Sequence, residues 1–467
     1  MAEIIDQIVK ISITDAISSV TTVDVNTVAI VGRIGVAAAR TLEITPELAP
    51  DKTGAEGSKK VSVSIGSETF EITTTASDAV SDVIDDLVAA INDQTTGSAL
   101  FTATDGTTKM TLIAKQVGTA ANAFRITVSS ADANIVLNNA SIVETASGNN
   151  AGTDTMETAS PKAVGEKYGY DSEIYAMAMT FYSQDSQPSR VVCIPLANAA
   201  ANSAILAAVK DAAEDFDFYH VVIASNDATF GIELLTDTTT GLQAWLADAK
   251  KVAEVQVADA TELKNHGCSR VAVFQHAETH GTSKEFLNVG IVALRCASDS
   301  ARGTFAHKKC KGVTQDSYSV EQYNEWVDAG INIYTKVSGE ARLFMGTTGS
   351  NESFIDQIIK DDWICFNVQS RIYQLLGEGN DGNGVNYDDA GIASVAASVL
   401  NVLTVAQDTD HQYVMADSAN VDYKPYSYLV ANYPEDVRKR NLPLVTGSYA
   451  RMNSIHTVVQ VSLQVTL

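Results

Sequence analysis

The most informative stretch of the sequence is IHTVVQVSLQVTL at residues 455–467. Its odd positions hold Ile455, Thr457, Val459, Val461, Leu463, Val465 and Leu467, while polar residues dominate the even positions. This period of two predicts a β-strand with one apolar face. Such a strand needs a partner, because an open apolar edge pairs with other chains. The partner is either the chain's own sheet or another copy, and both remain open.

A second alternating segment lies near the N-terminus. Residues 7–14 carry Val9, Ile11 and Ile13 between polar or charged neighbours. The same period predicts a strand there. We therefore expect an N-terminal strand arm at residues 1–20 and a C-terminal strand arm at residues 454–467.

Between the arms, strands and helices alternate. Apolar runs predict strands at residues 23–36, 190–196, 218–224, 270–274, 289–294 and 331–337. Helical spacing predicts helices at residues 241–252, 321–329, 353–376 and 390–405. We expect a mixed α/β core, discontinuous in sequence, that spans residues 21–45 and 156–453.

Residues 46–150 have a different composition, rich in Thr and Ser and poor in aromatic residues. Two hairpins are predicted, at residues 61–72 and 100–114, and a further strand at 124–128. An apolar face at helical spacing predicts a helix over residues 80–91, with Ser77 as N-cap and Asp78 in the first turn. The order is ββα followed by three strands. Borders rich in Pro and Gly, at residues 46–54 and 147–152, mark an inserted β-rich domain, which we expect to be surface-exposed.

Composition excludes several classes of function. The chain has 467 residues and a net charge of −25, which disfavours nucleic acid and anionic membranes as partners. Its five cysteines are scattered without a Cys-x-x-Cys pair, as expected for reduced thiols made in a cytoplasm. The N-terminal residues lack the pattern of a secretory signal, and the longest weakly charged stretch is too short to span a bilayer.

No motif for an enzyme stands out, and we expect no catalytic residue, cofactor or metal. Neither a phosphate-binding loop nor Gly-x-Ser-x-Gly is present. His276, Glu278 and His280 with Cys268 lack the spacing of a zinc site, so structural histidines are the favoured interpretation. The acidic loop at residues 380–389 lacks the calcium-binding register, which favours a polar surface loop. The adjacent acids Asp361 and Asp362 are expected on a solvated helix face or near a helix dipole.

Two dense basic clusters stand out in this acidic sequence. One comprises Lys308, Lys309 and Lys311, and the other Arg438, Lys439 and Arg440. They are either solvated loops or contacts with an acidic surface of a neighbouring copy or another protein.

The order of three segments resembles the sheath protein of contractile phage tails, Mu-like and related, and of contractile injection particles. These segments are the Thr-rich insertion (VSVSIGSETFEI, AVSDVIDDLVAAIN and KMTLIAKQVGTAANAFRITV), the run FIDQIIKDDWICFNVQSRIYQLL at residues 354–376, and the closing run at residues 441–467. The resemblance covers nearly the whole chain.

The resemblance implies a mechanical role in a virion or injection particle. Many copies would surround an inner tail tube, join baseplate and terminator proteins, and lend their terminal strands to neighbouring copies. Contraction from a strained extended state would drive the tube through a target envelope without consuming nucleotide. The rival interpretation is a static self-assembling surface protein, such as a surface-layer subunit or an adhesin.

Overall fold

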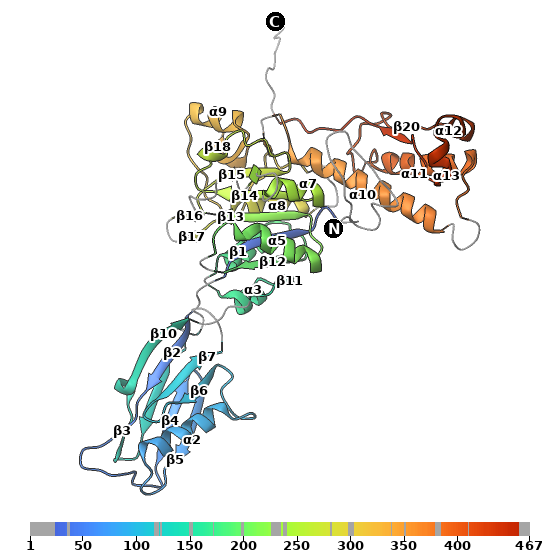
Figure 1. Cartoon of the computed structure of the whole chain (residues 1–467). Coiled ribbons are helices and arrows are strands. Elements are labelled where there is room, and N and C mark those ends of the chain that lie inside the picture. The colour runs from blue at the N-terminus through green and yellow to red at the C-terminus, as the bar shows by residue number, and fades with distance from the viewer. Residues whose placement is uncertain are drawn as a thin grey trace.

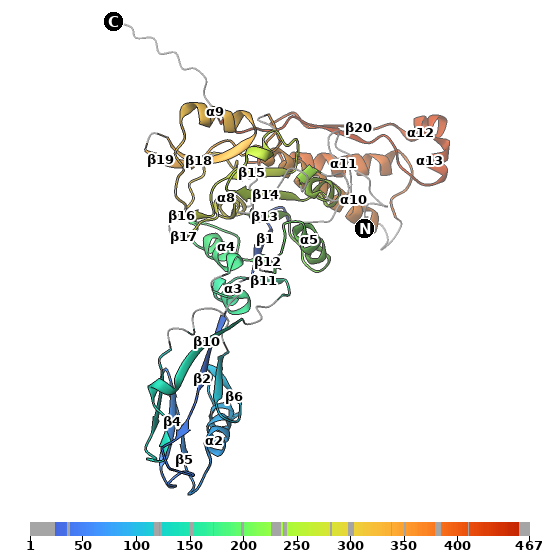
Figure 2. The same cartoon turned by 60° about the vertical axis from the view of Figure 1, so that its left-hand side comes forward.

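The computed structural model describes residues 24–34, 38–115, 121, 124–148, 153–170, 172–197, 200–225, 235–236, 241–280, 283–297, 303–337, 339–349, 352–378, 384–409 and 411–456. Helices and strands alternate along the chain, and the fold has the mixed α/β class that the sequence predicts. A β-rich unit projects from a central sheet flanked by helices, and a helical part extends beside that sheet (Figures 1 and 2).

The central sheet has eight strands in the order β11-β12-β1-β13-β14-β15-β18-β19. Its six inner strands run parallel to one another, whereas β11 and β19 pair antiparallel at the two edges. In spatial order the strands span Met156–Thr158, Val191–Leu196, Val28–Arg33, His220–Ser225, Val252–Val257, Val271–Gln275, Ile331–Val337 and Glu340–Leu343.

Helices cover both faces of this sheet, which explains why its inner strands are nearly continuous apolar runs. One face packs against α4 (Glu173–Tyr182), α8 (Leu287–Cys296) and the start of α10 (Ile355–Glu378). The other packs against α5 (Ala204–Asp215) and α7 (Leu242–Ala249). Two further helices lie near the edges, α3 (Pro161–Tyr168) and α9 (Val320–Asp328).

The strand predicted at residues 289–294 is wrong, because these residues belong to α8. Nine of the ten residues of α8 are buried, so the helix shows no polar face that would reveal its period. Asn288 fastens the helix to the sheet by donating to the carbonyl oxygens of Ile223 and Glu254. The sequence does not predict strand β14, because Glu254 and Gln256 interrupt its apolar pattern although both are buried.

The β-rich unit consists of small sheets around its own apolar core. One sheet has the order β10-β2-β7-β6 and another the order β5-β4-β8. The hairpins predicted at residues 61–72 and 100–114 are present as β4–β5 and β6–β7. The strands span Ala38–Ile44 (β2), Glu47–Leu48 (β3), Lys60–Ile65 (β4), Glu68–Thr73 (β5), Phe101–Asp105 (β6), Met110–Ala114 (β7), Ile126–Ser130 (β8), Ile135–Val136 (β9) and Ile142–Gly148 (β10).

The chain enters and leaves this unit on adjacent antiparallel strands, because β2 pairs with β10 along its whole length. Helix α2 (Val80–Asn92) buries the apolar face that the sequence predicts. Its N-cap is Ala79 rather than Ser77, and the side chain of Asp82 accepts from the Ala79 amide at 2.8 Å. Asp78 instead accepts from the amide of Thr75, so it belongs to the preceding turn.

The helical part is built on α10 and α11 (Asp389–Val405), which match the two long helices predicted from the sequence. A separate apolar cluster joins these two helices. The short strands β20 (Asn420–Asp422) and β21 (Thr446–Ser448) form a two-stranded sheet, and α12 (Tyr426–Asn432) and α13 (Pro434–Arg438) lie between them in sequence. Among the described residues, no helix is both long and apolar enough to cross a membrane.

Candidate functional site: the anchor of the C-terminal segment

Residues 449–456 run beside helix α10 and are fastened to the core by polar contacts, which we call the C-terminal anchor. Asp361 of α10 accepts from Tyr449 Oη at 2.8 Å and from Arg451 Nε at 3.1 Å, and Arg451 Nη2 adds a second ion-pair contact. Asp361 is only 6% exposed, whereas the Arg451 side chain is 36% exposed, so the pair lies at the border between the core and solvent.

The residue before Asp361, Lys360, reaches the same segment. Its Nζ donates to the Met452 carbonyl oxygen at 2.8 Å and lies 3.7 Å from Asp356 Oδ2. Burial lowers the pKa of Lys360, and Asp356 opposes that effect. The backbone of Met452 also donates to the Tyr413 carbonyl oxygen, so this stretch is held from two sides.

The last described residue of the anchor is His456. Its Nε2 lies 2.8 Å from Thr304 Oγ1, and its carbonyl oxygen lies 3.0 Å from His307 Nε2. The imidazole packs edge-on against the Phe354 ring, with 4.9 Å between ring centroids. Burial lowers the pKa of His456, which favours the neutral ring. Ile455, by contrast, is 81% exposed.

Asp362 points to the other side of α10, into the core. It accepts from Arg270 in a bidentate pair, at 2.6 and 2.9 Å, and from Tyr219 Oη at 2.7 Å. The expectation of a solvated face for Asp361 and Asp362 is therefore wrong. Sequence alone missed their roles because each partner is remote in the chain, and only the helix packing brings them together.

The residues predicted for strand exchange lie outside the described residues. They are Val9, Ile11 and Ile13 at the N-terminus and Val459, Val461, Leu463, Val465 and Leu467 at the C-terminus. The structure describes the C-terminal segment up to His456, immediately before the alternating residues from 457 onward.

The first basic cluster is divided in space. Lys308 is half-buried near Arg295, and this burial lowers its pKa to about 8. Lys309 is exposed, and Lys311 forms an ion pair with Asp185.

The second basic cluster lies at the end of α13. Arg438 pairs with Glu435 of the same helix, while Lys439 and Arg440 are exposed. A contact of either cluster with a partner stays a prediction.

The acidic loop at residues 380–389 is described from residue 384. Asp388 caps α11 by accepting from the Gly391 amide, and Asp389 accepts from the Tyr426 amide. Both carboxylates therefore serve the local fold.

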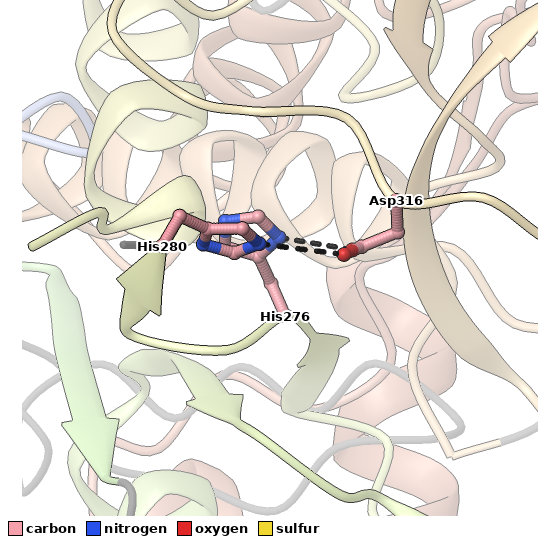
Figure 3. Close-up of side chains that lie close together, drawn as sticks. All are labelled: His276, His280 and Asp316. Atoms are coloured by element: carbon pink, nitrogen blue, oxygen red, sulfur yellow. Dashed lines mark hydrogen bonds and ion pairs between the residues drawn. The ribbon is translucent and has the colours of Figure 1, made fainter. Parts of the chain in front are cut away.

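His276 and His280 come together with Asp316, as Figure 3 shows. Cys268, considered with them on sequence grounds, is buried against the backbone near His266 and Gly349. The sequence missed Asp316, because it lies in a separate loop with no spacing relation to the two histidines. A group of two imidazoles and a carboxylate has the donor atoms of a metal site.

No family model and no curated protein matches the chain. Among solved structures, the helical sheath of the anti-feeding prophage in its contracted state is 13% identical, with a TM-score of 0.49 over 67% of this chain and 89% of that chain.

Two sheath tail proteins are also similar. The one from Desulfitobacterium hafniense is 9% identical, with a TM-score of 0.37 over 96% of this chain and 100% of that chain. The one from Listeria innocua is 11% identical, with a TM-score of 0.36 over 83% of this chain and 76% of that chain. These structures are sheath proteins, the family that the sequence resembles, and the likeness concerns the fold alone.

Proposed function

We propose that the chain is a structural, non-enzymatic subunit of a contractile tail sheath. Many copies polymerise around an inner tube and are joined by their terminal strands. They contract from a metastable extended state and so drive the tube through a target envelope. The proposal rests on the order of the three segments that resemble sheath proteins and on the C-terminal anchor.

The anchor is the observation that carries the proposal. A strand lent to a neighbour transmits force only if the chain just before it is fastened to its own subunit. Asp361, Lys360 and Thr304 hold residues 449–456 in this way, and the alternating run follows directly. Strand addition would supply main-chain hydrogen bonds, and the alternating side chains would fit pockets on the receiving copy.

The two-stranded sheet β20–β21 is a candidate receiver for such a strand. Both of its strands are edges, and their side chains are mostly exposed. A two-stranded sheet is only marginally stable in water, so it gains stability from an added strand. Relative movement of copies during contraction would then occur where the chain passes from the anchor into the donated strand.

We further propose that the inserted β-rich domain decorates the outside of the assembly. The composition predicts that this domain spans residues 46–150. The pairing of β2 with β10 supports a slightly different extent, residues 38–148. Because Ala38 and Gly148 are paired neighbours, a short Gly-Ser linker can replace the domain without pulling the core apart. Tubes should still form after this replacement, and their loss from a folded core would contradict the placement.

Assembly should also depend on salt. Copies with a net charge of −25 repel one another, so moderate screening favours assembly. Acidic groups of a neighbouring copy would pair with the exposed cations Lys309, Lys439 and Arg440. Assembly that does not respond to ionic strength would contradict this use of the charge.

The decisive experiment removes residues 457–467 and examines the purified protein by negative-stain microscopy. This truncation leaves every described contact of His456 and the rest of the anchor in place. We expect a folded subunit that forms no tubes. Tubes from the truncated protein would overturn strand exchange, and flat sheets from the full chain would favour the static surface protein.

A matched pair of variants distinguishes a strand with one apolar face from a terminal segment that associates non-specifically. V459D/V461D places two charges on the apolar face of the alternating run, and Q460D/S462D places two charges on the polar face. Because the added charge is equal, only V459D/V461D should prevent tube formation. Equal behaviour of the two variants would contradict the predicted strand.

A further inference from the structure

Two histidines and two carboxylates lie together beyond the end of β15. His276 directly follows that strand, and His280 lies in the short strand β16 (Thr279–His280). Their rings are stacked, with 4.7 Å between centroids and 18° between planes (Figure 3). Asp316 faces one edge of the stack and Glu285 the opposite edge.

The edge toward Asp316 has the spacing of a metal site. Asp316 Oδ2 lies 2.9 Å from His276 Nδ1, and Asp316 Oδ1 lies 3.7 Å from His280 Nε2. Two ligand atoms that each lie about 2.1 Å from a tetrahedral zinc ion are about 3.4 Å apart. The two observed distances fall on either side of this value, and the ligand atoms of all three residues lie within 4.8 Å of one another, so side-chain rotations would bring them onto one ion.

The edge toward Glu285 explains how the rings would be oriented. Glu285 Oε2 lies 3.4 Å from His276 Nε2 and 3.5 Å from His280 Nδ1. Both of these nitrogens are buried, and neither has a hydrogen-bond partner among the described residues. Metal-bound histidines usually donate their second N–H to a carboxylate, which fixes the tautomer and raises ligand basicity. A metal at the Asp316 edge would make both distal nitrogens donors facing Glu285.

The backbone of Asp316 and the carboxylate of Glu285 are held in place before any ion binds. The Asp316 amide donates to the Tyr334 carbonyl oxygen at 2.9 Å, and Thr335 Oγ1 donates to the Asp316 carbonyl oxygen at 2.8 Å. Glu285 accepts from the amide and hydroxyl of Thr314 at 2.5 and 2.7 Å. His276 is 1% exposed, so one ligand is already fixed by burial.

From this geometry we propose that His276, His280 and Asp316 bind one divalent transition-metal ion of the zinc class, with Glu285 as a positioning residue for both imidazoles. Imidazole and carboxylate ligands suit Zn²⁺ better than Mg²⁺ or Ca²⁺, which prefer oxygen ligands alone. The side chains of His280 and Asp316 are 24% and 21% exposed, which gives the ion a path from solvent.

The ion would fasten three separate segments at one end of the central sheet. These are the end of β15, the β16–β17 hairpin, whose second strand is Ser283–Lys284, and the loop that contains Asp316. Two-residue strands contribute little stability alone, so a metal cross-link there has a large local effect. This role is independent of strand exchange and goes beyond the proposed sheath function.

The test uses the full chain, purified without a histidine tag and stripped with a chelator. Zn²⁺ binding is measured by calorimetry, and Co²⁺ is added separately to look for the visible absorption of a tetrahedral site. We expect one ion per chain. D316N and H280A should each weaken binding at least ~100-fold, and E285Q by ~10–100-fold.

The matched control is H411A. His411 lies beside the carboxylate of Asp408, at 2.8 Å, but it belongs to the helical part and is not one of the proposed ligands. Because His411 is not a ligand of the proposed site, H411A should change the zinc affinity by less than about twofold. Zinc should raise the melting temperature of the wild type and of H411A but not that of D316N. An absence of stoichiometric binding, or equal affinity in the wild type and D316N, would overturn the proposal.

Discussion

Replacing Asp362 by Asn tests whether a buried ion pair holds α10 to the central sheet. Asp362 is 2% exposed and Arg270 is 3% exposed, and the two form a bidentate pair at 2.6 and 2.9 Å. Tyr219 donates to the same carboxylate at 2.7 Å. D362N keeps the size of the side chain but removes its charge, which leaves the Arg270 guanidinium buried without a counter-ion.

The expected loss follows from that uncompensated charge. Removing one partner of a buried pair costs about 3–5 kcal/mol, because the remaining ion has lost its water and regains no equivalent partner. Arg270 also donates to the Lys251 carbonyl oxygen at 3.3 Å, but this uncharged acceptor does not replace a carboxylate. We therefore expect D362N to lower the free energy of unfolding of the core by about 4 kcal/mol.

The assay is urea unfolding of the non-assembled subunit, followed by Trp fluorescence and circular dichroism. D361N is the matched control: it makes the same chemical change one residue earlier, where the Arg451 side chain is 36% exposed, and should cost less than half as much. The double variant R270M/D362L should recover most of the loss, since apolar replacement of a buried pair is often neutral. A D362N loss below about 1 kcal/mol, or no recovery in the double variant, would refute the reasoning.

Three further predictions concern buried groups. Burial lowers the pKa of His266 to about 4, so the unfolded chain binds its proton more readily between pH 6.5 and 4. Stability is therefore lost as the pH falls through that window, by about 2–3 kcal/mol, and H266Q should abolish this loss in urea titrations at pH 7 and 4.5. Burial raises the pKa of Glu173 to about 7, so its contribution has the opposite sign: stability is lost as the pH rises from 4.5 through 7, and E173Q should flatten that limb when midpoints at pH 5 and 8 are compared. A Cβ at Gly290 would lie 2.0 Å from Cys310 Sγ, so G290A should lower the free energy of unfolding by about 1–3 kcal/mol and with it the melting temperature. C310A should partly restore the melting temperature, and a G290A variant as stable as the wild type would show that α8 is loosely packed.

The elements with a local signal were predictable from the sequence. Hairpins β4–β5 and β6–β7 and helix α2 each show a complete period within a short stretch and lie partly at a surface. Elements buried on every side were harder, because burial removes the contrast between faces that reveals a period. Helix α8 was mistaken for a strand for this reason, and β14 was missed because buried Glu254 and Gln256 resemble surface residues in a sequence.

The candidate sites show the same division. The alternation from Ile455 predicts a C-terminal strand. The anchor at residues 449–456 includes the first two residues of that run, and it depends on Asp361, which the sequence places on a solvated helix face or near a helix dipole. Likewise, the sequence showed His276 and His280 close together but not the carboxylates that face them.

The mixed α/β class, the Thr- and Ser-rich composition of the β-rich unit and the acidic charge follow from the sequence, because periodicity and composition are local or additive properties. Which charges are buried, and what they pair with, depends on the packing of elements that are distant in the chain. Asp362 pairs with Arg270, and Asp316 contacts His276; in both cases the two residues belong to separate segments of the chain. The free energy of a charge depends on its solvent exposure and its partners in space, and neither can be read from neighbours along the chain.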